Sequence, residues 1–241
     1  MSDWRKVYDG IVCELTRKGA TSAYRQDADE PDPGYQSYGV RAPQVKDTHD
    51  RYAKEIRGWP VSDQIALAER LVTSGFGEQQ TIALNVLERH TNEFAERGPE
   101  FTEWVFRKLL GWSKVDAFTG RLLSRLLVAQ KELYLPVIEG WSRDPSMWMR
   151  RASIAVFTRK LAKSGFEIDF ALEQCDRLKS DPERLVLTAV GWSLKDYLVF
   201  DQSRVLDRLR FYENQGVSGI VLRYAMRGLP ASQKRKKLTP R

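Results

Sequence analysis

The chain has 241 residues, of which 42% are hydrophobic and 29% charged, and its formal net charge is +7. This composition is typical of a soluble globular protein, and no apolar run approaches the roughly 18 residues that a membrane span needs. The N-terminal stretch lacks the apolar centre of a signal peptide, so we expect a cytoplasmic protein.

The positive charge is concentrated at the C-terminus. Segment 230–241 carries five of the charges, which leaves the rest of the chain near +2. These five are Lys234, Arg235, Lys236, Lys237 and Arg241. We predict that this segment is a basic, disordered tail; the alternative is a non-specific attraction for nucleic acid.

Apolar residues recur at helical spacing along the chain, whereas the alternation typical of strands is almost absent. A first helix is expected over 3–19, followed by an acidic, Pro- and Gly-rich loop that includes 26–34. Pro43 can begin a second helix that runs to about residue 56. Further helices are expected over 61–73, 78–91, 99–110, 113–130, 131–141, 146–163, 167–179, 182–198, 203–213 and 217–228. No linker long enough to divide domains appears.

An internal repeat is carried by alanines. Ala83, Ala117, Ala152 and Ala189 lie in similar segments that are spaced 34, 35 and 37 residues apart. Two of these segments follow an Asp-Pro dipeptide, at 144–145 and 181–182, where Asp can cap a helix and Pro can occupy its first turn. Self-similarity at this period is typical of stacked helical pairs. We therefore predict an all-α fold, an α-solenoid, with a single domain over residues 1–229.

Four residues acquire a common place in this repeat. Asp116 and Arg151 each precede the repeat alanine by one residue, so stacking predicts that they are neighbours. Trp112 lies four residues before Asp116, and Trp192 lies four residues after Thr188, the equivalent position in the next segment. Because residues four apart share a helix face, the register predicts a groove that is aromatic, acidic and basic.

Several enzyme classes are disfavoured by what the sequence lacks. Cys13 and Cys175 match no metal-ligand spacing and are expected in the core. His49 and His90 are the only histidines, too few for a typical zinc site or a Ser-His-Asp arrangement. No glycine-rich phosphate loop is present. We expect no metal and no cofactor, which leaves carboxylate chemistry as the main option.

Five stretches carry a resemblance to a known family. They are YGVRAPQVKD at 38–47, AERLVTSGFGEQQTIALNVL at 68–87, GWSKVDAF at 111–118, WMRRASIAV at 148–156 and GWSLKDY at 191–197. In this order they resemble the DNA alkylation repair glycosylases built of HEAT-like repeats, the AlkD type. The resemblance implies HEAT-like helical repeats with a concave DNA-binding groove. Tyr24 and Tyr35 both match the family's N-terminal tyrosine motif poorly, so neither is carried over.

The resemblance further implies an activity and a set of site residues. The activity is hydrolysis of the N-glycosidic bond of positively charged alkylated purines, such as N3-methyladenine and N7-methylguanine, without base flipping. By motif position, Trp112, Asp116 and Trp192 match the catalytic cleft, and Arg151 matches a DNA-backbone contact. The implied partner is double-stranded DNA carrying alkylated bases, bound by a monomer.

The residue types suit this chemistry by themselves. Asp116 can stabilise the sugar cation and orient water, and the two indoles can hold cationic charge, while Arg151 can bind a phosphate. Lys114, Lys195 and Arg223 are further candidate phosphate contacts. Each also has a structural alternative: a capping box between Ser113 and Asp116, packing tryptophans, an Asp116–Arg151 salt bridge, and solvated lysines and arginines.

Two other functions stay open at this point. A non-catalytic protein of the same architecture would bind branched or distorted DNA through the basic groove. A scaffold for other proteins is the commonest use of helical solenoids. Asp116 between two tryptophans favours the glycosylase, because a protein that only binds DNA has little use for an anion that faces phosphate.

Overall fold

A computed structural model describes residues 3–22, 32 and 34–229 of the chain. The chain forms two compact units, Met1–Leu126 and Leu127–Arg241. Among the described residues the secondary structure is helical, apart from one isolated bridge between Gln36 and Phe76. The all-α prediction is therefore confirmed, and the assignment of residues 1–229 to one domain stays a prediction.

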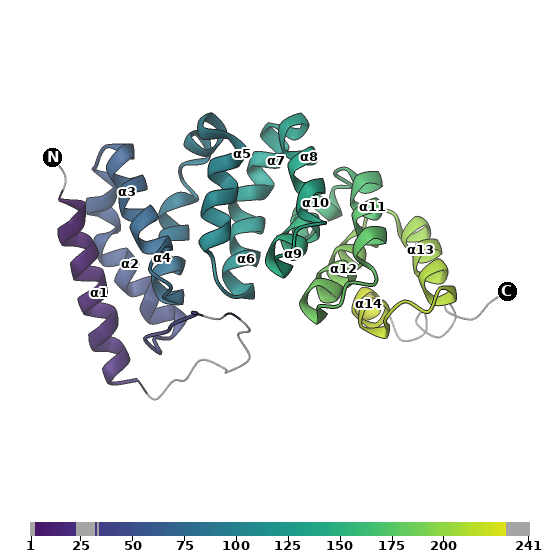
Figure 1. Cartoon of the computed structure of the whole chain (residues 1–241), viewed down its shortest axis with the longest axis horizontal. Coiled ribbons are helices and arrows are strands. Elements are labelled where there is room, and N and C mark those ends of the chain that lie inside the picture. Colours follow the sequence, from purple (N-terminus) through teal and green to yellow (C-terminus); the bar gives the residue numbers. More distant parts are fainter. Residues whose placement is uncertain (1–2, 23–31, 33, 230–241) are drawn as a thin grey trace. The chain divides into compact units, whose positions relative to one another are not determined.

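The first unit stacks its helices in two layers (Figure 1). The helix α1 packs on α3 and α3 on α5, while α2 packs on α4 and α4 on α6. Alternate helices therefore form each layer, which is the packing expected of stacked helical pairs. Their bounds are α1 Trp4–Ala20, α2 Ala42–Arg57, α3 Val61–Val72, α4 Gly77–Leu87, α5 Thr91–Lys108 and α6 Trp112–Phe118, followed by a π-helical turn Thr119–Leu123 and α7 Ser124–Ala129 across the unit boundary.

The second unit is built in the same way (Figure 1). Its central helix α12 packs against α9, α11 and α14, and it contacts α10 and α13 as well. The bounds are α8 Lys131–Trp141, α9 Met147–Ala155, α10 Arg159–Lys163, α11 Ile168–Leu178, α12 Arg184–Tyr197, α13 Gln202–Asn214 and α14 Gly219–Ala225, with a final 3₁₀ turn Met226–Gly228.

Polar contacts between repeats join α8, α11 and α13. Arg177 on α11 forms an ion pair with Glu139 on α8 at 2.7 Å. Asp176 accepts a hydrogen bond at 2.7 Å from the Tyr212 hydroxyl on α13 and pairs with Arg208. These contacts connect residues one repeat apart, so they hold neighbouring repeats in register.

The prediction of one continuous helix over 146–163 is wrong, because the helix is broken at Val156–Thr158. Thr158 has extended backbone angles of φ −130° and ψ −179°. The Phe157 carbonyl accepts a hydrogen bond from the Ser193 hydroxyl, and the Arg159 amide donates to Asp196. Tertiary contacts from α12 therefore replace the backbone hydrogen bonds of a continuous helix.

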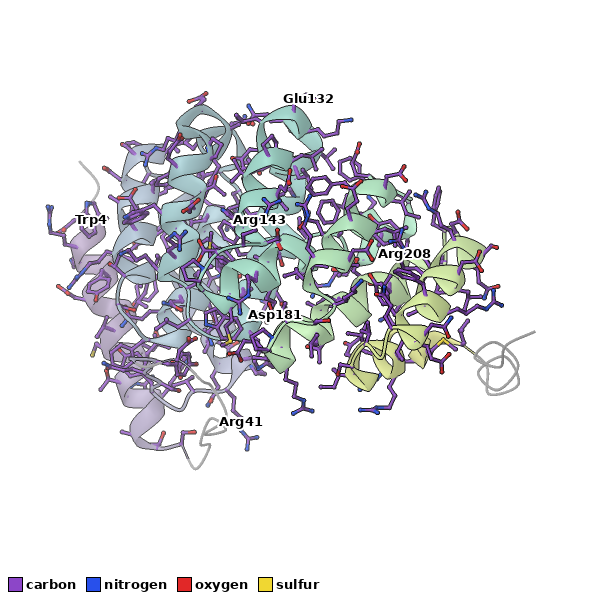
Figure 2. All side chains as sticks on the ribbon, turned by 45° about the vertical axis from the view of Figure 1, so that its right-hand side comes forward. Trp4, Arg41, Glu132, Arg143, Asp181 and Arg208 are labelled. Carbon is purple, nitrogen blue, oxygen red and sulfur yellow. The ribbon has the colours of Figure 1, made fainter. Side chains whose placement is uncertain are left out.

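The Asp-Pro dipeptides do not act as helix caps, contrary to the prediction. Asp144 and Asp181 each accept a hydrogen bond from the amide two residues later, at 2.8 and 2.9 Å. This is the turn that Asp side chains commonly form. The helices that follow begin at Met147 and Arg184, so both prolines lie outside them. Asp181, in the turn before α12 (Figure 2), also forms an ion pair with Arg150 at 2.7 Å.

Three further expectations were tested. Cys175 is buried as predicted, but Cys13 is exposed on α1, so its assignment to the core is wrong. A helical stretch from Thr91 was missed, because α5 contains a non-helical Gly98 before Pro99 and only its second half shows clear periodicity. The predicted tail 230–241, and the acidic loop 26–34 apart from Asp32 and Gly34, lie outside the described residues.

A glycine pair tests the packing of α12 on α14. A Cβ at Gly191 would lie 2.7 Å from Tyr224 Cβ and 2.9 Å from the Val221 carbonyl oxygen. We expect Gly191→Ala to lower the free energy of unfolding by about 1–3 kcal/mol, because backbone must move. A Cβ at Gly140, inside α8, would meet nothing within 4 Å. Gly140→Ala should therefore raise the free energy of unfolding by about 0.5–1 kcal/mol. Urea unfolding measures both, and equal changes would contradict the packing described.

Candidate functional site

Trp112 and Asp116 lie on one face of α6 in the first unit. The helix begins after Gly111, whose φ of 82° favours glycine, and the Gly111 amide donates to Asp32 Oδ2 at 2.7 Å. Trp112 is 49% exposed, whereas Asp116 is 8% exposed. The residue that caps this helix is Gly111, so the capping box between Ser113 and Asp116 is excluded. An exposed indole thus lies one helical turn from a nearly buried carboxylate.

A pocket of about 250 Å³ opens beside Trp112. It is lined by Tyr35, Val40, Ala42, Val45, Gly77, Glu78, Thr81, Trp112, Ser113 and Lys114. Lys114 Nζ donates to the Tyr35 hydroxyl at 2.9 Å and lies 4.5 Å from the centre of its ring. Lys114 is buried, so this predicted phosphate contact forms part of the pocket wall.

The segment from Tyr35 to Val40 holds this wall against α4. Gln36 pairs with Phe76 in the isolated bridge, and the Tyr38 ring stacks on Phe76 at 4.3 Å. Glu78 Oε1 accepts hydrogen bonds from the Ser37 hydroxyl at 2.7 Å and from the Val40 amide at 3.1 Å. Its Oε2 is buried and accepts no hydrogen bond within the described part of the chain. The carboxylate thus anchors the segment that carries Tyr35.

Trp192 lies on α12 in the second unit, with its side chain partly exposed. The Arg159 guanidinium carbon lies 4.8 Å from the centre of the indole ring, a cation–π distance. Asp196, one turn further along α12, accepts a hydrogen bond from the Arg159 amide at 2.7 Å. Lys195 forms an ion pair with the same carboxylate at 3.2 Å. This face of the second unit is therefore aromatic and net positive.

Arg151 connects α9 to α12. Its Nη1 donates to the Leu185 carbonyl and, at 3.3 Å, to the Thr188 hydroxyl. Arg151 and Thr188 occupy equivalent positions in the repeat, so this contact confirms the register within the second unit. Arg151 is 5% exposed. Asp116 belongs to the first unit, and its predicted proximity to Arg151 stays a prediction.

Basic and aromatic side chains continue onto α14. Arg223 is exposed, so it is accessible to a phosphate. Tyr224 packs closely over Gly191, and Arg227 lies 4.2 Å from the centre of its ring. Lys195 Nζ lies 5.9 Å from the same ring. The second unit thus presents two aromatic rings with cations beside both.

Three side chains in these surroundings were not singled out as site residues from the sequence. Tyr35 reaches the pocket because its segment packs against the start of α4, a contact that sequence spacing does not reveal. Arg159 has a φ of 54°, which nothing in the local pattern indicates. Arg227 lies one helical turn after Arg223, so helical spacing alone would have pointed to it.

Other titratable groups offer little chemistry. Burial raises the pKa of the Cys175 thiol, which keeps it protonated and unsuited to nucleophilic attack. Burial also lowers the pKa of His90, whose ring nitrogen lies 3.0 Å from Gln64 Oε1. No cluster of His, Cys, Asp and Glu suited to a metal ion occurs among the residues described, and no helix there has the length and apolarity to cross a bilayer.

Comparisons with known proteins agree with this architecture. The family model of the DNA alkylation repair enzymes matches residues 18–229. A solved structure named "Predicted DNA alkylation repair enzyme from Enterococcus faecalis" is similar at a TM-score of 0.68 and 17% sequence identity. The similarity covers 94% of this chain and 96% of that one. At this identity the structural likeness concerns the fold. No curated protein matches the chain.

A serine pair tests how α12 positions the turn beside Trp192. The Ser193 hydroxyl donates to the Phe157 carbonyl at 2.7 Å, and both residues are fully buried. Ser193→Ala leaves that carbonyl without its partner and should lower the free energy of unfolding by about 1–3 kcal/mol. The matched control is Ser164→Ala, whose exposed hydroxyl also donates to a carbonyl, at 2.8 Å. We expect a change within about 0.5 kcal/mol there. Thermal unfolding measures both, and similar shifts would contradict this role of Ser193.

Proposed function

The chain belongs to the family of DNA alkylation repair enzymes, and we propose that it is a DNA glycosylase acting on positively charged alkylated purines in duplex DNA. The expected lesions are N3-methyladenine and N7-methylguanine, released by hydrolysis of the N-glycosidic bond without base flipping. The observation that carries the proposal is the pair on α6: Trp112, which is 49% exposed, lies one turn from Asp116, which is 8% exposed.

This pair matches the demands of the reaction. Alkylation at N3 or N7 makes the base cationic and therefore a good leaving group, so no general acid is required. The sugar develops oxocarbenium character as the bond breaks. A nearly buried carboxylate can stabilise that charge strongly, because little water screens it, and can orient the attacking water. We assign this role to Asp116.

The indole of Trp112 would pack against the deoxyribose beside the lesion. An aromatic face attracts positive charge by about 0.5–2 kcal/mol, so it favours both the cationic base and the developing sugar cation. The neighbouring pocket, with Tyr35 and Lys114 in its wall, is proposed to receive the DNA strand that enters from this side.

The second unit would contribute binding to the same DNA. Trp192 offers another aromatic face, and Lys195 and Arg223 are proposed to contact phosphates. Arg151 is also proposed to contact the backbone, in addition to its observed hydrogen bonds to Leu185 and Thr188. Contacts of this kind fix the register of the DNA without reading its sequence.

The substitution Asp116→Asn tests the catalytic assignment. It keeps the size of the side chain and removes the charge, so the single-turnover rate of base release from methylated duplex DNA should fall at least about 100-fold. The dissociation constant for the same duplex should change by less than about threefold, because the lost charge does not attract phosphate. Base release is followed by chromatography and binding by fluorescence anisotropy.

A matched control is Asp169→Asn, which removes a carboxylate whose side chain is 78% exposed. Its excision rate should equal that of the native chain. If Asp116→Asn excises as fast as the native chain, the assignment of Asp116 is wrong. If the native chain binds methylated DNA and releases neither base, the chain is a DNA-binding protein without this activity. If it does not bind DNA at all, the scaffold function takes precedence.

Substitution of two tryptophans distinguishes a role in excision from a role in packing. Trp112→Ala should lower the excision rate about tenfold, which corresponds to the cation–π contribution, while the free energy of unfolding changes by less than about 1 kcal/mol. For Trp148, which is 7% exposed, substitution should affect the free energy of unfolding more than the excision rate. Trp148→Ala should cost about 3–5 kcal/mol of stability. A large loss of stability in Trp112→Ala would identify a packing residue.

A further inference from the structure

Arg159 adopts a backbone conformation that arginine rarely takes. Its φ of 54° lies in the left-handed region, where a side chain with a Cβ is strained. The residue follows the break between α9 and α10, at which a helix predicted from the sequence is interrupted. Strain of this kind persists only where the surroundings enforce it, and it is enriched at functional sites. Helix formation alone therefore does not explain the positive φ of Arg159.

Three side chains of α12 hold this turn and its arginine. The Ser193 hydroxyl holds the Phe157 carbonyl at 2.7 Å, and Asp196 Oδ2 accepts from the Arg159 amide at 2.7 Å. Asp196 is 5% exposed, so the hydrogen bond is shielded from water. One turn before Asp196, the Trp192 ring lies 4.8 Å from the Arg159 guanidinium. The turn is thus held in a geometry that brings the guanidinium onto the indole.

The charges around this contact complement DNA. Lys160 is exposed beside Arg159, and Lys195 pairs with Asp196, which accepts the Arg159 amide, at 3.2 Å. Arg159, Lys160 and Lys195 thus bring three cations to this part of the second unit. Arginine stacked on an aromatic ring is less mobile than arginine in solvent, so less side-chain entropy is lost when it meets a phosphate.

We propose that Arg159 and Trp192 bind DNA as one unit, in which the strained turn holds the guanidinium on the indole and directs its charge to a backbone phosphate. The proposal rests on the DNA-binding part of the function above and is independent of excision. It adds to the site a residue whose role depends on backbone geometry.

Substitution at Arg159 should change stability and binding in opposite directions. Arg159→Gly removes the guanidinium and adopts the positive φ without strain, so the melting temperature should stay equal or rise. The dissociation constant for duplex DNA should increase about tenfold, as expected for loss of one charge-assisted contact. The slope of log K against log salt should fall by about 0.9, the value for one phosphate. Arg159→Lys, which keeps the charge, should retain the slope.

The matched control is Glu167, the other non-glycine residue with positive φ among those described, at 46°. Glu167→Gly relieves the same kind of strain at the start of α11, and it should leave affinity and salt slope unchanged. A double-mutant cycle with Trp192→Phe tests whether the pair acts as a unit. The double variant should then lose less affinity than the product of the two single losses.

Three results would overturn the proposal. In the first, Arg159→Gly binds DNA with native affinity and slope. In the second, Arg159→Gly and Glu167→Gly lose affinity equally. In the third, Arg159→Gly melts at a lower temperature and Arg159→Asn, which also tolerates positive φ, binds like the native chain. If the native chain binds duplex DNA without excising bases, only the glycosylase proposal fails, because affinity and slope still decide the role of Arg159.

Discussion

Close approach of neighbouring helices at small side chains is the constraint on which the other features depend. Ala83, Ala152 and Ala189 have no exposed surface, and Gly191 lies against Tyr224 with no room for a Cβ. A helix in a stack of repeats buries its apolar face only against its neighbours, so their spacing sets how much water is excluded. Where the helices approach closely, the side chains beside the small residues acquire fixed positions. Thr188 and Trp192 on α12 owe their places to this packing.

Polar contacts then decide which side chains face outward. In the second unit, three side chains of α12 form hydrogen bonds to residues near the proposed DNA-binding surface. The Thr188 hydroxyl accepts a hydrogen bond from Arg151, and Asp196 accepts one from the Arg159 amide. The Ser193 hydroxyl donates to the Phe157 carbonyl and so holds the turn before α10. In the first unit Glu78 has the corresponding role, because it anchors the segment that carries Tyr35. Both units thus use a buried polar side chain to position an aromatic or basic residue.

The helices could be predicted from the sequence because the spacing of apolar residues reflects burial on one helix face. The repeat register could be predicted from the spacing of the alanines. The register within the second unit is confirmed by the contact between Arg151 and Thr188. The break at 156–158 was missed, because the residues that cause it, Ser193 and Asp196, lie 36 or more residues away in sequence. Cys13 was misplaced because an amphipathic helix near the end of a stack has a solvent face that its pattern does not mark. The roles of Trp112, Asp116 and Trp192 came from motif resemblance, and they stay predictions that the proposed substitutions test.

The attachment of Asp32 and of the segment from Tyr35 to Val40 affects how the first unit forms. Asp32 binds the Gly111 amide, and Tyr35 binds Lys114, each across 79 residues of sequence. Contacts in a stack of repeats are mostly local, and closing a loop of this length costs more chain entropy than closing one repeat. These contacts add to the contact order of the unit, so they are expected to form late in folding, after α1 to α6 have packed. The pocket beside Trp112 would then be completed last and opened first, and its wall would exchange amide hydrogens sooner than the helices beneath it.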